Sequence, residues 1–230
     1  MSDLENLNTG AQEALAVAKL GDLRKKINSD AWSENMEDLL AGWGEKAAGL
    51  RFMHAKTASS WKVFAKNLSI SSIVITSVAS TLSLVATSVN DPDTKNGVLF
   101  GVGGVGLVAA LIQSFIKFYN AEEKAAEHAS ISKQFGSFYR FMTLQMGMNR
   151  EDRDPVNSLS QYALKEYERL QTEAPSLSEN SIKLFKQTFK SSEQRFPDVA
   201  EDKFVIYIER PGNKNKGSTW INEVVLSNES

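Results

Sequence analysis

The sequence contains no cysteine, only two histidines and no excess of either charge, and each shortage excludes a class of function. Without cysteine the chain forms no disulfide, no thiolate metal site and no thiol nucleophile. Its 26 basic and 28 acidic residues give a net charge of -2, so there is no general basic excess to hold a nucleic-acid backbone. We therefore expect no cofactor, no metal site and no nucleic-acid partner.

Charged residues are also absent from two long internal runs. Residues 67–90 and 96–116 form runs of 24 and 21 uncharged residues, separated only by residues 91–95. A helix of about 20 residues crosses the roughly 30 Å hydrocarbon core of a bilayer. Helices in soluble cores rarely extend so far without a charge. The runs therefore predict two transmembrane helices joined by a short polar tip.

Hydroxyl-bearing and small residues recur along both runs at helical spacing. Gly97 and Gly101 have a GxxxG spacing, which lets helix backbones approach closely in lipid. Gln113 is strongly polar, and it either bridges helices by hydrogen bonds or lines a pore. For both faces the alternatives are packing and pore lining, and we favour packing. The faces consist of Ser69, Ser72, Thr76, Ser80, Ser83 and Thr87 in the first run and of Gly97, Gly101, Gly106, Ala110 and Gln113 in the second.

The charges that flank the runs predict an orientation. Lysines and arginines precede the first run and follow the second, whereas the tip carries only Lys95 beside Asp91 and Asp93. Basic residues are enriched on the cytoplasmic side of membranes. We therefore expect a multi-pass integral membrane protein with two spans and both termini in the cytoplasm.

Apolar residues also recur every three or four positions outside the runs, which is typical of long helices. One stripe extends from Leu40 to Leu68 and another from Phe118 to Met146. These stripes predict two stalk helices that continue from the spans and pack against each other. At the N-terminus we expect a short amphipathic helix, with Ser29 and Asp30 capping the helix that follows.

Beyond residue 149 the pattern changes, because Pro155 cannot continue a helix interior. The charged cluster 150–154 is interpreted as a solvated helix cap, and two shorter helices follow it. Residues 203–209 and 219–226 predict strands joined by a turn. The expected fold class is an all-α membrane protein: a two-span helical hairpin extended into a cytoplasmic helical bundle, with a small C-terminal β-hairpin. The segments are an amphipathic helix (1–30), a stalk (31–66), a span (67–90), the tip (91–95), a span (96–116), a stalk (117–149), short helices (150–196) and a strand-rich tail (197–230).

The two histidines lie at matching positions on the stalks. His54 stands 13 residues before the first run begins, and His128 stands 12 residues after the second run ends. In an antiparallel hairpin they would therefore meet at nearly the same height. The pair could bind a metal, act as a pH switch, or simply fix the register of the stalks, and we favour the last. No catalytic constellation is found elsewhere, so we expect no enzyme.

Several short motifs together resemble the SLATT domain, a family with two spans and long helices. The similarity covers roughly residues 30–190 and is closest to stand-alone members found in large DNA viruses and algae. It implies a non-enzymatic membrane effector, proposed in bacterial settings to oligomerise into pores when a partner enzyme makes a nucleotide signal. In this sequence no sensor or nucleotide-synthesising domain accompanies the match. The motifs are Trp43–Ala47, Leu50–His54, the two runs, Ala125–His128, Arg150–Arg153 and Ala174–Pro175.

Two functions remain open from the sequence. The first is a non-enzymatic membrane protein that self-associates through its stalks and small-residue faces, with pore formation as one outcome. The alternative is a structural membrane anchor, such as a minor capsid or internal-membrane protein of a virion, that links a bilayer to a protein shell. The expected partners are the lipid bilayer, further copies of the chain, and a shell or other membrane protein bound through the cytoplasmic bundle and tail.

Overall fold

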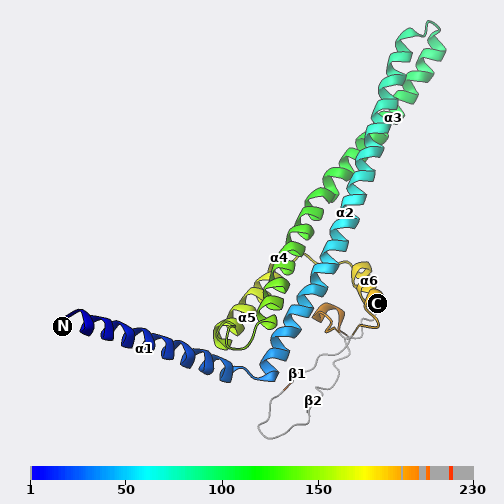
Figure 1. Cartoon of the computed structure of the whole chain (residues 1–230). Coiled ribbons are helices and arrows are strands. Elements are labelled where there is room, and N and C mark those ends of the chain that lie inside the picture. The colour runs from blue at the N-terminus through cyan, green and yellow to red at the C-terminus, as the bar shows by residue number, and fades with distance from the viewer. Residues whose placement is uncertain (1, 193, 202–205, 208–217, 220–230) are drawn as a thin grey trace. The chain divides into compact units, whose positions relative to one another are not determined.

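The computed structural model describes residues 2–192, 194–201, 206–207 and 218–219, with side chains described for 15–192 and 194–201. Almost all of this described part is helical (Figure 1). The elements are α1 (Ser2–Ala31), α2 (Glu34–Ser88), α3 (Pro92–Tyr119), α4 (Ala121–Gly147), α5 (Val156–Glu173), α6 (Glu179–Thr188), the 3₁₀ turn η1 (Asp198–Ala200), β1 (Ile206–Tyr207) and β2 (Ser218–Thr219).

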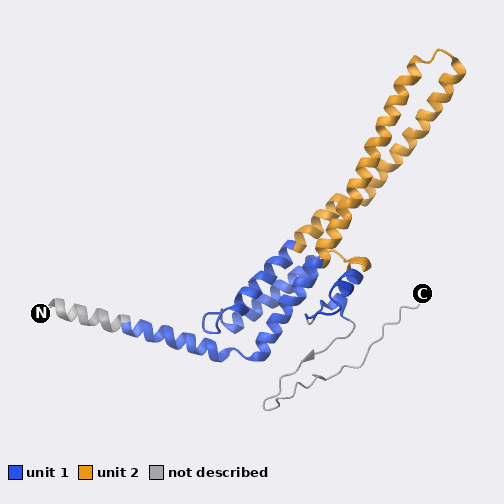
Figure 2. Ribbon diagram, turned by 45° about the vertical axis from the view of Figure 1, so that its right-hand side comes forward, with its two compact units in different colours: residues 1–52, 133–174, 182–230 blue, residues 53–132, 175–181 orange. Residues whose placement is uncertain are grey.

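The chain divides into two compact units, coloured separately in Figure 2. Unit 1 comprises Met1–Phe52, Lys133–Ala174 and Ile182–Ser230, and unit 2 comprises Met53–Ser132 and Pro175–Ser181. Three of the divisions fall within α2, α4 and α6, and the fourth falls between α5 and α6.

Unit 1 is a helical bundle built on the apolar stripes of α2 and α4. The Trp43 ring stacks on the Tyr167 ring of α5, with centroids 6.5 Å apart. Deleting side chains from such a close-packed core costs about 2–5 kcal/mol each, so this core is the main source of stability in the unit. Its fully buried side chains include Leu40, Phe135, Met142, Leu159, Leu170 and Phe185.

The start of α2 differs from the expected one. Helix α1 extends to Ala31 and includes Ser29 and Asp30, so neither residue caps the next helix. The cap is Ser33, whose Oγ accepts a hydrogen bond from the Met36 N–H at 3.3 Å. A serine at this position satisfies one of the free N–H groups of the first helical turn.

A C-terminal strap, defined here as residues 195–201, packs against α2 within unit 1. The Lys46 ammonium contacts the Asp198 carboxylate at 2.5 Å and the Glu201 carboxylate at 3.5 Å. The Pro197 ring is fully buried and lies directly over Gly49. Glycine is required at this point because a side chain would occupy the space of the ring.

Replacing Gly49 with alanine is expected to destabilise unit 1. The added Cβ would lie 2.5 Å from Pro197 Cγ and 3.1 Å from Phe185 Cζ. Overpacking of this kind costs about 1–3 kcal/mol, which exceeds the helix propensity of roughly 1 kcal/mol that alanine gains over glycine. Urea unfolding of the full chain in detergent measures the change.

Gly21→Ala is the matched control for this prediction. Gly21 also lies in a helix, but a Cβ there meets nothing within 4 Å. This control is expected to be neutral or slightly stabilising. Equal effects of the two substitutions would contradict the proposed contact between the strap and α2.

Unit 2 contains a long antiparallel hairpin in which α2 and α3 lie side by side (Figure 2). One face of each helix is shielded by the other, and these two faces form the seam of the hairpin. On α2 the shielded residues are Ala65, Leu68, Ser72, Ile75, Ala79, Leu82 and Ala86, and on α3 they are Val98, Val102, Val105, Ala109, Ile112 and Ile116. Steps of three and four residues along both helices are those of ordinary helix–helix packing.

The tip of the hairpin is shorter than the expected loop 91–95. Helix α3 begins at Pro92, and Asp91 is its N-cap, accepting a hydrogen bond from the Thr94 N–H at 2.9 Å. Proline in the first turn of a helix lacks only an N–H that would be unpaired there in any case. This cap brings most of the predicted loop into the helix.

The second stalk is also interrupted where a continuous helix was expected. Asn120 separates α3 from α4 and has φ 44° and ψ 46°, in the left-handed region. Asparagine tolerates this conformation better than most residues. The break changes the phase of the helix, and Phe118, expected on the packed stripe, is 80% exposed.

The expected C-terminal β-hairpin lies mostly outside the described residues. Within them, β1 and β2 pair antiparallel, with Ile206 opposite Thr219 and Tyr207 opposite Ser218. A larger hairpin therefore stays a prediction.

Candidate functional site

The hairpin of α2 and α3 exposes the apolar surface of both uncharged runs. By length and composition, two helical stretches in the described residues could cross a membrane: Glu34–Ser88 and Pro92–Gly147. In their most apolar 18-residue windows, 6% of the first and 0% of the second is buried. Core helices of soluble proteins bury such windows, so the exposed surface distinguishes this hairpin from them.

Most hydroxyl groups on the hairpin donate hydrogen bonds to their own helix. Thr76 Oγ1 donates to the Ser72 carbonyl at 2.8 Å, and Ser80 Oγ donates to the Thr76 carbonyl at 2.9 Å. Such bonds leave the hydroxyls with no need of water. The same arrangement, to a carbonyl three or four residues earlier, is found at Ser77, Thr81, Thr87, Ser88 and Ser114.

Gln113 is the exception, because its amide reaches across the seam. Its Nε2 donates to the Oγ of Ser72, a side chain that is buried between the helices. Among the hydroxyl and small residues predicted to form helix-packing faces, these two are brought into direct contact. The bond matches the bridging alternative for Gln113.

The small residues of α3 fall on two different edges of the hairpin. Gly106 precedes Gln113 by seven residues, so both lie on the edge that carries the hydroxyls of α2. Gly101 precedes Tyr119 by 18 residues, or five turns, and so lies on the edge where Tyr119 contacts Phe64. We call the first the hydroxyl edge (Ser69, Ser72, Thr76, Ser80, Ser83, Thr87, Gly106, Ala110 and Gln113) and the second the glycine edge (Gly97, Gly101 and Gly104).

The glycines of both edges are uncovered in the part of the chain that the structure describes. A Cβ built at any of Gly97, Gly101, Gly104 or Gly106 meets nothing within 4 Å. The glycines therefore do not serve the contact between α2 and α3, to which α3 contributes valine, alanine and isoleucine side chains. Their small surfaces remain available to another helix.

Aromatic side chains gather at the base of the hairpin, where the two runs meet the charged sequence. The Tyr119 ring contacts Phe64 at 5.7 Å, Phe115 at 6.4 Å and Phe118 at 5.3 Å between centroids. Trp61 contacts Phe64 at 5.9 Å, and the Lys124 ammonium lies 4.7 Å from the centre of the Trp61 ring. We call Trp61, Phe64, Phe115, Phe118 and Tyr119 the aromatic cluster.

The two histidines meet in the interior of unit 2. The Nδ1 atoms of His54 and His128 are 2.9 Å apart, and both rings are buried. Burial and the neighbouring His128 lower the pKa of His54 to about 4. Burial also lowers the pKa of His128, although the nearby Glu127 opposes this shift. At neutral pH the pair is therefore uncharged, with one ring donating to the other.

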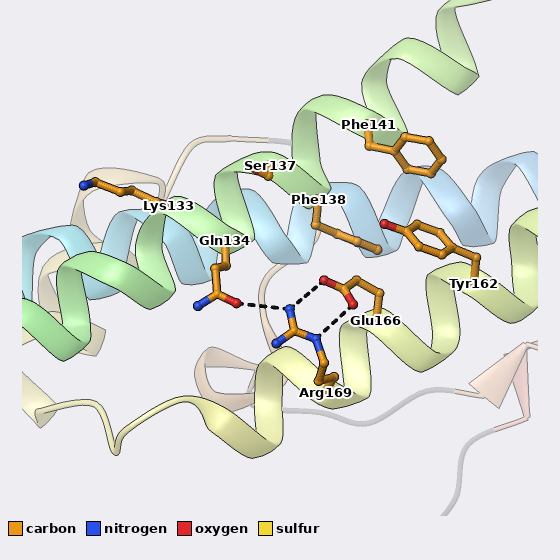
Figure 3. Close-up of a pocket in the computed structure, with 8 residues that line it drawn as sticks. All are labelled: Lys133, Gln134, Ser137, Phe138, Phe141, Tyr162, Glu166 and Arg169. Carbon is orange, nitrogen blue, oxygen red and sulfur yellow. Dashed lines mark hydrogen bonds and ion pairs between the residues drawn. The ribbon is translucent and has the colours of Figure 1, made fainter.

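In unit 1 a surface hollow lies between α4 and α5 (Figure 3). It has a volume of about 360 Å³ and a floor of aromatic rings, with Phe141 and Tyr162 in edge contact at 5.1 Å. Arg169 points into it but already pairs with Glu166 at 2.7 Å and with Glu173, and it donates to Gln134 at 3.0 Å. The arginine therefore ties α4 to α5, and we assign the hollow no ligand.

The charged cluster 150–154 proves to be a structural clasp where a solvated cap was expected. Arg150 donates two hydrogen bonds to the Glu37 carboxylate, at 2.9 and 2.6 Å, and Arg153 pairs with the same carboxylate. The Asn28 amide donates to the carbonyls of Arg150 and Arg153. These contacts, which we call the Glu37 clasp, join α1 and α2 to the loop before α5. Sequence reasoning missed them because Glu37 lies more than a hundred residues away from its partners.

No group of three or more histidine, cysteine, aspartate or glutamate side chains that could hold a metal ion occurs in the part of the chain that the structure describes. Comparison with known protein families, with curated proteins and with solved structures finds no match to this chain.

Proposed function

We propose that this chain is a non-enzymatic integral membrane protein whose α2–α3 hairpin crosses the bilayer twice and associates with further copies of itself. The main support for the proposal is the exposure of the most apolar 18-residue window of each helical stretch. Only 6% of the first window and 0% of the second is buried. In water such a surface would be a strong aggregation liability, whereas in a bilayer its burial is favourable.

The polar groups of the hairpin support this proposal. In hydrocarbon every polar group needs a partner within the protein. Most hydroxyls of the hairpin bond to their own helices, and Gln113 bonds to Ser72. The hairpin can therefore enter lipid without leaving these groups unpaired.

The base of the hairpin supports an orientation. Tryptophan and tyrosine are enriched where a membrane meets water, and lysine on the cytoplasmic side. In the sequence, Lys62, Lys66 and Lys117 each lie within two residues of a member of the aromatic cluster, whereas the tip has Lys95 with two aspartates. We therefore place the base and both termini in the cytoplasm.

The glycine edge is the surface we propose for contact between copies. Helices in lipid associate through small residues that allow close backbone approach, and no described residue of the chain covers the glycines of this edge. Copies joined there would leave the hydroxyl edge free to face a shared aqueous centre, which is the arrangement that a pore requires. The resemblance to the SLATT domain agrees with such an effector and forms part of the proposal.

The anchor function is favoured by one different observation. Leu20, Leu23 and Ile27 form an apolar stripe on α1 that is exposed within unit 1. Such a stripe suits a helix-binding protein partner. An anchor would span the membrane as a monomer and cross-link through α1 to another protein.

Extraction of membranes tests the first part of the proposal. The full chain is expected to stay in the pellet after washing with alkaline carbonate and to dissolve only in detergent. Ala109→Arg places a charge in the seam of the hairpin, at a cost of about 2.5–3.5 kcal/mol for insertion. This variant should leave the membrane fraction, whereas Ala163→Val in the core of unit 1 should not. Release of the unchanged protein by carbonate would overturn the proposal.

Cysteine cross-linking tests the self-association. Because the chain has no cysteine, a disulfide in a single-cysteine variant joins two copies at the substituted position. Gly101→Cys on the glycine edge is expected to form disulfide dimers in the membrane. Leu84→Cys, at a position that points away from the seam and is also exposed, is expected to stay monomeric. Equal dimerisation of both variants, or none for Gly101→Cys, would contradict association through the glycine edge.

A further inference from the structure

Three lysines lie on the hydroxyl edge of the hairpin. On α2, Lys62 precedes Ser69 by seven residues, which is about two helical turns. On α3, Lys95 precedes Gln113 by 18 residues, or five turns, and Lys117 follows Gln113 by four residues. The spacing that assigns the hydroxyls and Gln113 to this edge therefore adds one lysine at the tip and two at the base.

No carboxylate on this edge offsets the three lysines. Residues 47–90 contain no acid. At the tip, the Asp91 carboxylate already accepts hydrogen bonds from the Thr94 N–H and hydroxyl, at 2.9 and 2.6 Å. Asp93 precedes Gly104 by 11 residues, or three turns, and so lies on the glycine edge. All three lysines are exposed, and in the described part of the chain none of them forms an ion pair.

The base of the edge keeps its positive charge although acids begin the next helix. Glu122 and Glu123 lie in the first turn of α4, beyond the break at Asn120. There the positive end of the α4 dipole offsets part of their charge. Lys117, by contrast, directly follows the uncharged run. The charge closest to this end of the run is therefore positive.

Between its lysines the edge is polar but carries no charge. Thr76, Ser80, Ser83 and Thr87 are all exposed in the single chain. Hydroxyl groups can face water, but they do not select between ions of opposite sign as a fixed charge does. In channels the sign of the conducted ion is set by rings of charged side chains, with lysine and arginine for anions and aspartate and glutamate for cations.

We propose that the hydroxyl edges of associated copies enclose a pathway that conducts anions, attracted by Lys62 and Lys117 at the base and by Lys95 at the tip. This inference rests on the proposed function, in which copies joined at the glycine edge turn their hydroxyl edges towards a shared aqueous centre. A cation pathway would need carboxylates where this edge has lysines. Packing of the edge against another helix would close it to water, and no ion would pass.

Electrical recording from planar bilayers that contain the full chain tests the proposal. High and low concentrations of potassium chloride are placed on the two sides, and the voltage at zero current is measured. Its sign shows whether chloride or potassium is the more permeant ion. A unit charge about 8 Å from an ion in water favours an anion over a cation by about fivefold. We therefore expect chloride to be at least about fivefold more permeant at low salt, and the preference to weaken as salt is raised.

Substitution of the three lysines tests the origin of the preference. The triple glutamine variant, with Lys62→Gln, Lys95→Gln and Lys117→Gln combined, should lose the preference for chloride. The corresponding triple glutamate variant, Lys62→Glu with Lys95→Glu and Lys117→Glu, should prefer potassium.

A matched control removes the same number of charges from outside the hairpin. Lys19, Lys165 and Lys190 belong to unit 1, and all three are exposed. Their combined replacement by glutamine changes the net charge as much as the triple glutamine variant does. This control should keep the preference for chloride, because none of its substitutions lies on the hydroxyl edge.

The possible failures of the inference and of the proposed function differ in what is measured. Current without a preference for chloride, or a preference that the triple glutamine variant retains, would overturn the inference and leave a pore in place. A reconstituted protein that passes no current would overturn the anion pathway and the pore together. A chain that carbonate releases from membranes would refute the proposed membrane function itself.

Discussion

Replacing Glu37 with alanine is expected to lower the free energy of unfolding by about 2–3 kcal/mol, because two arginines lose their shared carboxylate. The Arg153 side chain is only 9% exposed, and its other hydrogen bonds go to the carbonyls of Met146 and Met148. It also lies over the Trp32 ring, 5.0 Å from the centre. Removal of Glu37 therefore leaves the Arg153 charge, which is largely shielded from water, without a counter-ion.

Glu34→Ala is the matched control, since Glu34 lies in the same first turn of α2 but is exposed and acts on the Glu37 clasp only through the attraction of its charge for Arg150. It should change stability by less than about 0.5 kcal/mol. Urea unfolding of the full chain in detergent, at constant pH, measures both variants. Equal effects would mean that the Glu37 clasp contributes no more than an ordinary surface charge.

The same carboxylate predicts the behaviour of unit 1 in acid. Hydrogen bonds from Arg150 and Arg153 lower the pKa of Glu37 from 4.5 to about 2. A group whose pKa is lower in the folded state stabilises the fold above its unfolded pKa. The contribution of Glu37 is therefore complete above pH 5 and is lost as the pH falls from about 4.5 towards 2. Glu37→Gln should remove this part of the acid sensitivity.

The sequence predicted those features that depend on local periodicity. Uncharged runs and apolar steps of three or four residues are patterns among neighbouring positions. Helices are also formed by residues that are close in the sequence. This is why the stripe from Leu40 through Ala47 and Leu50 to His54 is buried in the structure. The matching heights of the two histidines also followed from counting residues along two helices that share one turn.

The sequence could not predict features that depend on distant contacts. Gly49 is required because Pro197 lies over it, and Glu37 is important because Arg150 and Arg153 bind it. Both residues thus depend on partners that are distant in the sequence. The assignment of the small residues to a single face of α3 did not depend on any distant contact. The step from Gly101 to Gly106 is five residues, which moves the face around the helix by more than a quarter turn. The spacing of these two glycines in the sequence therefore already indicated two different faces of the helix.

The stability of unit 2 is expected to fall between pH 6.5 and pH 4 because of the histidine pair. The pKa of His54 is lowered from 6.5 to about 4 by burial, and next by the neighbouring His128. In this range the unfolded chain binds a proton that the folded chain excludes, so acid favours unfolding. The loss from His54 alone amounts to at most about 3 kcal/mol between pH 7 and pH 4. His128 adds to it in the same direction, because burial lowers its pKa too.

The geometry explains why the pair cannot accept a proton without cost. With the Nδ1 atoms 2.9 Å apart, one ring donates its proton and the other accepts it. A proton on the accepting Nδ1 turns it into a second donor and removes the bond. A proton on the outer nitrogen of the donating ring keeps the bond but places a charge in a buried position. Either event favours the unfolded chain.

The double variant His54→Asn and His128→Asn isolates this effect, because an amide retains hydrogen-bonding groups but does not titrate. Unfolding by urea in detergent, measured at intervals from pH 7.5 to pH 4, should give a steeper decline for the unchanged protein than for the variant. The carboxylates that titrate near pH 4 are common to both proteins, so the difference between the two curves belongs to the histidines. Parallel curves would show that the pair fixes the register of the helices without responding to pH.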